Sequence, residues 1–199
     1  MINCRRLLYV LILFYVSAYA KTPKEFKKFP EGKEPQLIGR KLVERYLSSK
    51  ESTNTIKYPE VCTWFGALRF PNVTKNEEML QRLENRFIPI LGSNSGAMQK
   101  PNHVDNTVFG IVPLKLYQYT GKKEYYDIGV DFADKQWVLP QNPNPKNVEK
   151  YNELFKRGLT WQTRFWIDDM FMITSIQSQA YLATKDPKYI NRAAHEITV

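Results

Sequence analysis

Apolar residues recur at helical spacing along most of the chain. Over residues 36–49 the apolar side chains lie three or four positions apart with charges between them, which predicts an amphipathic helix. Residues 63–70 predict a second helix, with Thr63 as its cap, and residues 76–91 predict a third, with two glutamates in its first turn. Apolar and polar residues do not alternate with period two, the pattern typical of strands, over any long stretch of the sequence. The pattern therefore predicts an all-α protein.

A pair of helices occurs twice. The first copy is an apolar helix over 105–120, a turn over 121–123 and a more polar helix over 124–138. The second copy is an apolar helix that begins at Asp168 or Asp169, a turn over 185–187 with a proline at a favourable first helical position, and another polar helix. The shared order of acid, apolar helix, turn and amphipathic helix indicates an internal repeat.

The repeat can be aligned in two ways. A shift of 64 residues matches Asp105 with Asp169, and it also matches three further pairs: Tyr117 with Tyr181, Thr120 with Thr184, and Tyr125 with Tyr189. A shift of 63 residues matches Asp105 with Asp168 instead. Helical hairpins cannot bury their apolar helices alone, so they stack in a solenoid or a ring, with the inner helices beginning on one face. Acids at these starts are then expected to lie close together.

The two acidic segments are the candidate site. Asp105 also fits the role of an ordinary helix cap. The stretch 161–172 carries two tryptophans, an arginine and the paired acids Asp168 and Asp169, and paired acids can raise one pKa towards the range of a general acid. Aromatic rings beside carboxylates are typical of sugar-binding clefts. The alternative is a double cap followed by core residues.

The N-terminus is typical of a secretory signal. Arg5 and Arg6 precede an apolar run over 7–16 and the small-residue site at Ala18 to Ala20, which predicts a signal peptide over 1–20 with cleavage after Ala20. A membrane anchor is the alternative, but a spanning helix needs about 20 apolar residues. Residues 21–35, rich in lysine and proline, predict a mobile leader, and residues 36–199 predict one domain. After cleavage Cys62 is the only cysteine, so an internal disulfide is excluded.

Charge and the chain end refine this picture. The net charge is +9, and removal of Arg5 and Arg6 leaves 27 − 20 = +7. Such a balance suits an anionic ligand, but the lysines are scattered or gathered in the leader, which disfavours nucleic acid as a partner. The last residues, 189–199, keep a helical pattern without a stop signal. We therefore expect an interrupted chain.

Several motifs together resemble a known family. They are NHVDNTVFG at 102–110, FWIDDMFM at 165–172, the turns at the ends of both apolar helices, and Trp64-Phe65-Gly66. Their order and spacing resemble the unsaturated glucuronyl and rhamnogalacturonyl hydrolases of glycoside hydrolase families 88 and 105. The resemblance implies an (α/α)6 toroid of six hairpins, of which this chain supplies about half.

The resemblance also implies an activity. The substrate is an anionic oligosaccharide left by a polysaccharide lyase, with a 4,5-unsaturated uronic acid at its non-reducing end. Asp168 protonates C4 and accepts a proton from the water that adds at C5, and Asp105 holds the sugar or assists. Asp169 is the alternative acid. Neither a metal nor another cofactor is implied, and the expected substrate-binding residues are Trp166, His103, Asn106, Asp169 and Trp64.

Two other functions compete with an exported glycosidase. One is a non-catalytic helical-repeat module that binds glycans or a protein partner on its concave face. The other is a subunit that completes a ring with a second chain, since exposed apolar inner helices favour association. The sequence leaves the oligomeric state open and predicts no membrane contact once the signal is removed.

Overall fold

The computed structural model describes residues 28–50 and 56–198. The predicted signal peptide lies outside the described residues, as do residues 21–27 of the predicted leader. The chain divides into two units, Met1–Gly39 and Arg40–Val199, and the boundary falls inside helix α2 (Pro35–Ser48). Across the described ranges, all regular secondary structure is helical, and no strand occurs. The prediction of an all-α protein is confirmed.

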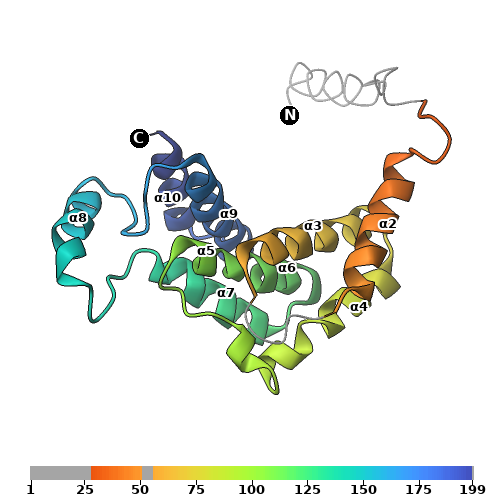
Figure 1. Cartoon of the computed structure of the whole chain (residues 1–199), viewed down its shortest axis with the longest axis horizontal. Coiled ribbons are helices and arrows are strands. Elements are labelled where there is room, and N and C mark those ends of the chain that lie inside the picture. Colours follow the sequence, from red (N-terminus) through yellow and green to blue (C-terminus); the bar gives the residue numbers. More distant parts are fainter. Residues whose placement is uncertain (1–27, 51–55, 199) are drawn as a thin grey trace, which may run out of the picture. The chain divides into compact units, whose positions relative to one another are not determined.

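The second unit is built from two layers of helices (Figure 1). In one layer α6 contacts α3 on one side and α9 on the other. Each helix of the other layer packs on the first-layer helix that comes before it in the chain: α4 on α3, α7 on α6 and α10 on α9. The bounds of these helices are α3 (Tyr58–Thr74), α4 (Glu77–Asn85), α6 (Ile111–Thr120), α7 (Lys123–Lys135), α9 (Ile167–Thr184) and α10 (Pro187–Thr198).

The shorter elements connect these layers. A 3-10 turn η2 (Ile88–Leu91) follows α4, and a second, η3 (Ser95–Ala97), comes before the one-turn helix α5 (Val104–Thr107). The 3-10 turn η4 (Val108–Gly110) joins α5 to α6, and α8 (Pro145–Lys156) lies between α7 and α9 in the chain. None of the described helices is both long and apolar enough to cross a membrane.

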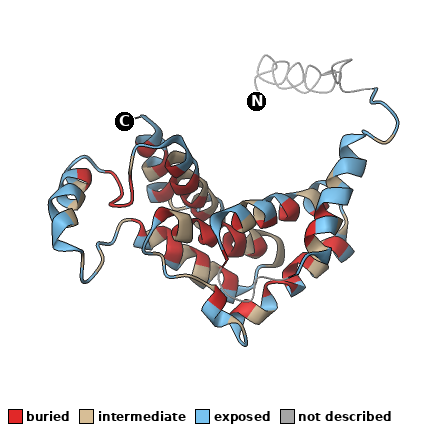
Figure 2. Ribbon diagram, viewed as in Figure 1, coloured by how far each residue is buried: buried red, intermediate tan, exposed pale blue. Residues whose placement is uncertain are grey.

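The core lies where the two layers meet (Figure 2). Its aromatic rings form a row in which each ring contacts the next. The ring centres lie 5.6 Å apart for Trp64 and Phe87, 5.8 Å for Phe87 and Phe109, and 5.5 Å for Phe109 and Phe132. The helices approach closely at Gly110, where an added Cβ would come within 2.5 Å of Ile176 Cδ1. Only a residue without a side chain fits there.

Both predicted hairpins are present. The first apolar helix ends at Gly121 and the second at Lys185, each in the left-handed conformation (φ 71° and 61°). The N–H groups of these caps donate to the carbonyls of Tyr117 and Tyr181, both at 2.8 Å. The hairpins are the units that a ring would repeat, and the closed six-hairpin ring stays a prediction.

The structure explains why two alignments of the repeat coexist. The helical segments begin at caps His103 and Trp166, 63 residues apart, but end at Gly121 and Lys185, 64 residues apart. The first copy contains the 3-10 turn η4, which rises about 2.0 Å per residue against about 1.5 Å in an α-helix. Over three residues this gains about 1.5 Å, the rise of one α-helical residue. Each alignment is therefore correct at one end.

Some element boundaries differ from the predictions. Helix α3 begins at Tyr58, five residues before Thr63, because Pro59 supplies a favourable first turn. Thr63 lies inside the helix, where its hydroxyl donates to Pro59 O at 2.8 Å, so its prediction as a cap is wrong. Helix α4 is shorter than predicted, and Asn76 caps it by accepting from the Met79 N–H at 3.0 Å. Helix α8 was not predicted.

Candidate functional site

Arg164 joins the starts of the two repeated hairpins. Its Nε donates to Asp169 Oδ2 at 2.8 Å and its Nη2 donates to Asp169 Oδ1 at 2.6 Å, a two-point contact between planar groups. The same Nη2 lies 3.6 Å from Asp105 Oδ1. The hydrogen bond to Asp169 raises the pKa of the guanidinium above its ordinary value, and nearby carboxylates add to this effect. Asp105 and Asp169 thus share one cation.

The adjacent acids Asp168 and Asp169 have opposite surroundings. The side chain of Asp169 is fully buried against Arg164. Asp168 is exposed, and its carboxylate makes no hydrogen bond to any described residue. Successive helical residues point about 100° apart, so only one of the two can face inwards. Asp168 and Trp166 are both exposed and therefore accessible to a ligand at the surface.

The backbone between Arg164 and α9 makes this pairing possible. Phe165 adopts a left-handed conformation (φ 62°), which a non-glycine residue adopts at a cost of about 1 kcal/mol. Trp166 is then extended and caps α9, and the Arg164 guanidinium lies 4.7 Å from the centre of its ring. The reversal at Phe165 brings Arg164 back against a residue five positions later in the chain.

His103 and Asn106 hold the start of α5. His103 takes the cap position, and its Nδ1 accepts from the Asp105 N–H at 3.2 Å. Asp105 therefore lies inside the first turn, and its prediction as a possible cap is wrong. Asn106 Nδ2 donates to Asn102 Oδ1 at 2.9 Å. Both predicted binding residues thus lie next to Asp105, at the surface or half-buried.

A surface hollow of about 190 Å³ lies beside this cluster. Its wall includes Arg164 and His103, and α8 contributes Lys150 and Tyr151. Lys150 forms no ion pair within the described ranges, so its charge is available to a ligand. Sequence reasoning missed this wall. The available signal was Asn144 followed by Pro145, a capping residue and a first-turn proline, and Asn144 Oδ1 does accept from the Lys146 N–H.

A row of buried amides connects the hairpins beneath the site. Gln177 of α9 donates to Oε1 of Gln136, the C-cap of α7, at 2.8 Å, and Gln136 donates to Gln162 Oε1 at 3.5 Å. Gln162 in turn donates to Thr107 Oγ1 of α5 at 2.8 Å. The row therefore ties the segment that carries Arg164 to the helix that carries Asp105.

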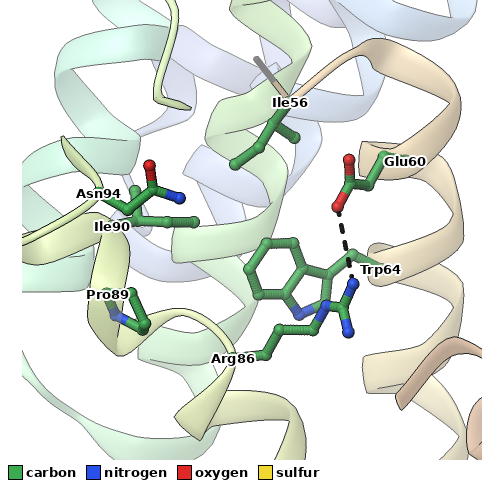
Figure 3. A pocket seen from close by; sticks show the side chains of 7 residues that line it. All are labelled: Ile56, Glu60, Trp64, Arg86, Pro89, Ile90 and Asn94. Atoms are coloured by element: carbon green, nitrogen blue, oxygen red, sulfur yellow. Dashed lines mark ion pairs between the residues drawn. The ribbon is translucent and has the colours of Figure 1, made fainter. Parts of the chain in front are cut away.

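Trp64 does not belong to this cluster. Its ring is 1% exposed and packs between Tyr46 and Phe87 in the core. Figure 3 shows it lining a cavity of about 10 Å³, beside the ion pair of Arg86 and Glu60 (4.0 Å). A cavity of this size holds no sugar. The structure therefore gives Trp64 a packing role in place of the predicted contact with substrate.

The described residues contain no group of three or more His, Cys, Asp or Glu side chains that could hold a metal ion. The chemistry available at the cluster is that of carboxylates, a guanidinium, an imidazole and an aromatic ring. Such groups bind and protonate a polar, anionic ligand.

Comparison with protein families gives one match. The model of glycosyl hydrolase family 88 matches residues 36–199, which include both hairpins and the whole cluster. Searches of curated proteins and of solved structures gave no significant match. The resemblance seen in the motifs is confirmed: this chain belongs to glycosyl hydrolase family 88, and at the level of that family it is a glycoside hydrolase for oligosaccharides that carry an unsaturated uronic acid.

Proposed function

We propose that the cluster around Arg164 removes a 4,5-unsaturated uronic acid from the non-reducing end of lyase-generated oligosaccharides, such as those of rhamnogalacturonan. Asp168 is the acid of this reaction and Asp105 holds the sugar. The supporting observation is the contrast between the two adjacent acids. Asp169 is buried and paired with Arg164, whereas Asp168 is exposed without a hydrogen-bond partner among the described residues. Of these two adjacent acids, Asp168 is the one that a ligand can reach.

The reaction is the hydration of an enol ether. The protonated Asp168 gives its proton to C4, the positive charge that develops is shared between C5 and the ring oxygen, and a water adds at C5. Asp168 takes a proton from that water and is restored. The resulting hemiketal opens and releases the rest of the saccharide. Because the bond is broken after hydration, the separation of two carboxylates does not decide the stereochemistry here.

The charges near the cluster suit an anionic substrate. Arg164 is already balanced by Asp105 and Asp169, so among the described residues that line the hollow Lys150 on α8 is the cation that can meet a uronate carboxylate. The exposed Trp166 offers a ring face to the apolar side of a sugar. His103 and Asn106 lie beside Asp105, where they can bind hydroxyl groups. We further propose that the chain is exported and that its hairpins belong to a six-hairpin ring.

The test follows the absorbance of the enol ether in the ultraviolet as lyase products are consumed. We expect Asp168→Asn to lower kcat/KM by about 100-fold or more, since an amide cannot donate the proton. Asp131→Asn, which removes an exposed acid on α7, is the matched control and is expected to keep the rate. Failure of the unaltered protein to consume any unsaturated uronide, or full activity of Asp168→Asn, would overturn the proposal. Glycan binding without turnover in both proteins would favour a binding module.

A further inference from the structure

The segment that carries Arg164 is held from beneath by α10. Glu196, in the last turn of that helix, is 1% exposed. Its Oε2 accepts from the Thr160 N–H at 3.3 Å, and its Oε1 lies in a close hydrogen bond with the Thr163 hydroxyl. Neither lysine nor arginine pairs with Glu196 anywhere in the described part of the chain. A buried carboxyl group without a cation is costly in its charged form.

Counting hydrogens shows which form of Glu196 fits. The Thr163 hydroxyl has one hydrogen but two acceptors within reach, Glu196 Oε1 and the Thr160 carbonyl at 2.9 Å. If Glu196 is ionised, Thr163 can donate to only one of them, and the other contact places two lone pairs together. If Glu196 is protonated, Oε1 donates to Thr163, and Thr163 donates to the Thr160 carbonyl. The neutral form completes both bonds.

The neighbouring hydroxyl offers no alternative. Thr160 Oγ1 donates its own hydrogen to the Gln136 carbonyl and accepts from the Gln162 N–H at 3.3 Å. Its hydrogen is therefore committed, and it cannot serve Glu196. The hydrogen bonds around Glu196 close into one complete set only when the carboxyl group carries a proton.

The charged groups around Glu196 agree with this assignment. Burial raises the pKa of Glu196 above 4.5, against opposing effects of Thr163, Thr160 and His195. His195 on α10 uses Nε2 to donate to the Arg157 carbonyl at 2.6 Å. The Arg157 guanidinium lies over the Phe165 ring, and that of Arg164 is paired with Asp169, so neither compensates the carboxyl group. The C-cap of α7 contributes the uncharged Gln136.

We propose that Glu196, in its neutral form, is a positioning residue for the site: it fixes Thr160 and Thr163, and through them it holds Arg164 between Asp105 and Asp169. The catalytic consequence rests on the proposed function, whereas the structural consequence does not. Ionisation of Glu196 breaks the hydrogen-bond set and loosens the segment from Thr160 to Arg164.

The first experiment measures backbone amide exchange in that segment. Glu196→Gln keeps the whole pattern, because its carbonyl accepts from Thr160 and its amide donates to Thr163, so we expect exchange within about twofold of the unaltered protein. Glu196→Ala leaves the Thr160 N–H without a partner, and we expect the amides of the segment to exchange about tenfold faster or more in this variant. Glu149→Gln, the same change on the exposed face of α8, is the control. Exchange in Glu196→Gln as fast as in Glu196→Ala would overturn the proposal.

A second pair of variants keeps the test decisive if Glu196→Ala fails to fold. Thr163→Ser keeps the hydroxyl group and is expected to exchange like the unaltered protein. Thr163→Val keeps the shape but removes the hydroxyl, and the segment is expected to exchange about tenfold faster. Equal exchange in the serine and valine variants would contradict the role of this contact.

The pH dependence separates positioning from simple packing. A folded pKa above 4.5 means that the contribution of Glu196 is complete below pH 4.5 and is lost as the pH rises through the folded value. We therefore expect the unaltered protein to lose protection of the segment with rising pH, after correction for intrinsic exchange, while Glu196→Gln does not. Identical pH profiles of the two proteins would overturn the proposal.

Activity measurements then connect the segment to the site. On an unsaturated uronide, kcat/KM of the unaltered protein is expected to fall on the alkaline side more steeply than that of Glu196→Gln. The same alkaline limb in both would show that Glu196 does not act on catalysis. If the exchange pattern is as expected but neither protein turns over substrate, the proposed function fails and the positioning role stands.

Discussion

The α5–α7 hairpin and the α9–α10 hairpin both place an acid at the second helical position, Asp105 in one and Asp168 in the other, yet they surround it differently. In the first, Asp105 is half-exposed and is also the residue that contacts Arg164. In the second, an additional acid, Asp169, pairs with Arg164 and leaves the Asp168 carboxylate at the surface without a hydrogen bond or ion pair to the described residues. The second hairpin therefore uses two acids for the two roles: Asp169 makes the contact with Arg164, and Asp168 stays accessible at the surface.

The hairpins differ in their backbones as well. The first contains the 3-10 turn at Val108–Gly110 and needs glycine at 110 to approach α9. The second is α-helical from Ile167–Thr184. Tight packing in the first copy and a buried ion pair in the second therefore stabilise the site in different ways.

The largest effect on stability is expected at the buried acid. Asp169→Ala leaves Arg164 without its main partner and is expected to lower the free energy of unfolding by about 3 kcal/mol. Denaturation by urea measures this. Asp168→Ala is the matched control and is expected to change the free energy by less than about 1 kcal/mol. Equal losses at the two positions would contradict the contrast between them.

A smaller loss is expected at the close approach of the first hairpin. An added methyl group at Gly110 meets Ile176 Cδ1 at 2.5 Å and Phe132 Cβ at 2.7 Å, and Cβ of Phe132 cannot rotate away. We expect Gly110→Ala to lower the melting temperature, with a loss of about 2 kcal/mol. Gly66→Ala in α3 meets nothing within 4 Å, and there we expect a gain of about 1 kcal/mol. If Gly110→Ala and Gly66→Ala changed the stability in the same direction, the packing argument would be refuted.

The smallest effect is expected at Asp105. Its carboxylate is 40% exposed and 3.6 Å from Arg164, so the charge is well solvated. Asp105→Asn is therefore expected to cost about 0.5 kcal/mol of unfolding free energy, measured in the same urea series. A loss near that of Asp169→Ala would show that the two carboxylates are equivalent partners of Arg164.

Much of the fold was predictable because local chemistry fixes it. The glycine at 121 and the Lys-Asp-Pro turn at 185–187 end the apolar helices as expected, and helical periodicity sets the elements between them. The shift of one residue between the two alignments was not resolvable, because a 3-10 turn leaves no clear pattern in apolar spacing.

The site was predictable in part. Acids at hairpin starts indicated the region, and the structure brings Asp105 and Asp169 to the same guanidinium. The central place of Arg164 depends on the left-handed turn at Phe165, which nothing in local propensity favours. The burial of Trp64 depends on the rings of Tyr46 in α2 and of Phe87, which directly precedes η2, contacts that periodicity within one helix cannot specify.

The row of glutamines from α9 to α5 has a direction. Each amide nitrogen faces the next oxygen, from Gln177 through Gln136 and Gln162 to Thr107. Turning the amide of Gln136 or Gln162 would set nitrogen against nitrogen, and turning that of Gln177 would set oxygen against oxygen. Slow hydrolysis of Gln162 to glutamate as the protein ages would therefore place a charge in a dry interior and remove the donor that anchors Thr107. This one lesion would break the side-chain link between the segment that carries Arg164 and α5.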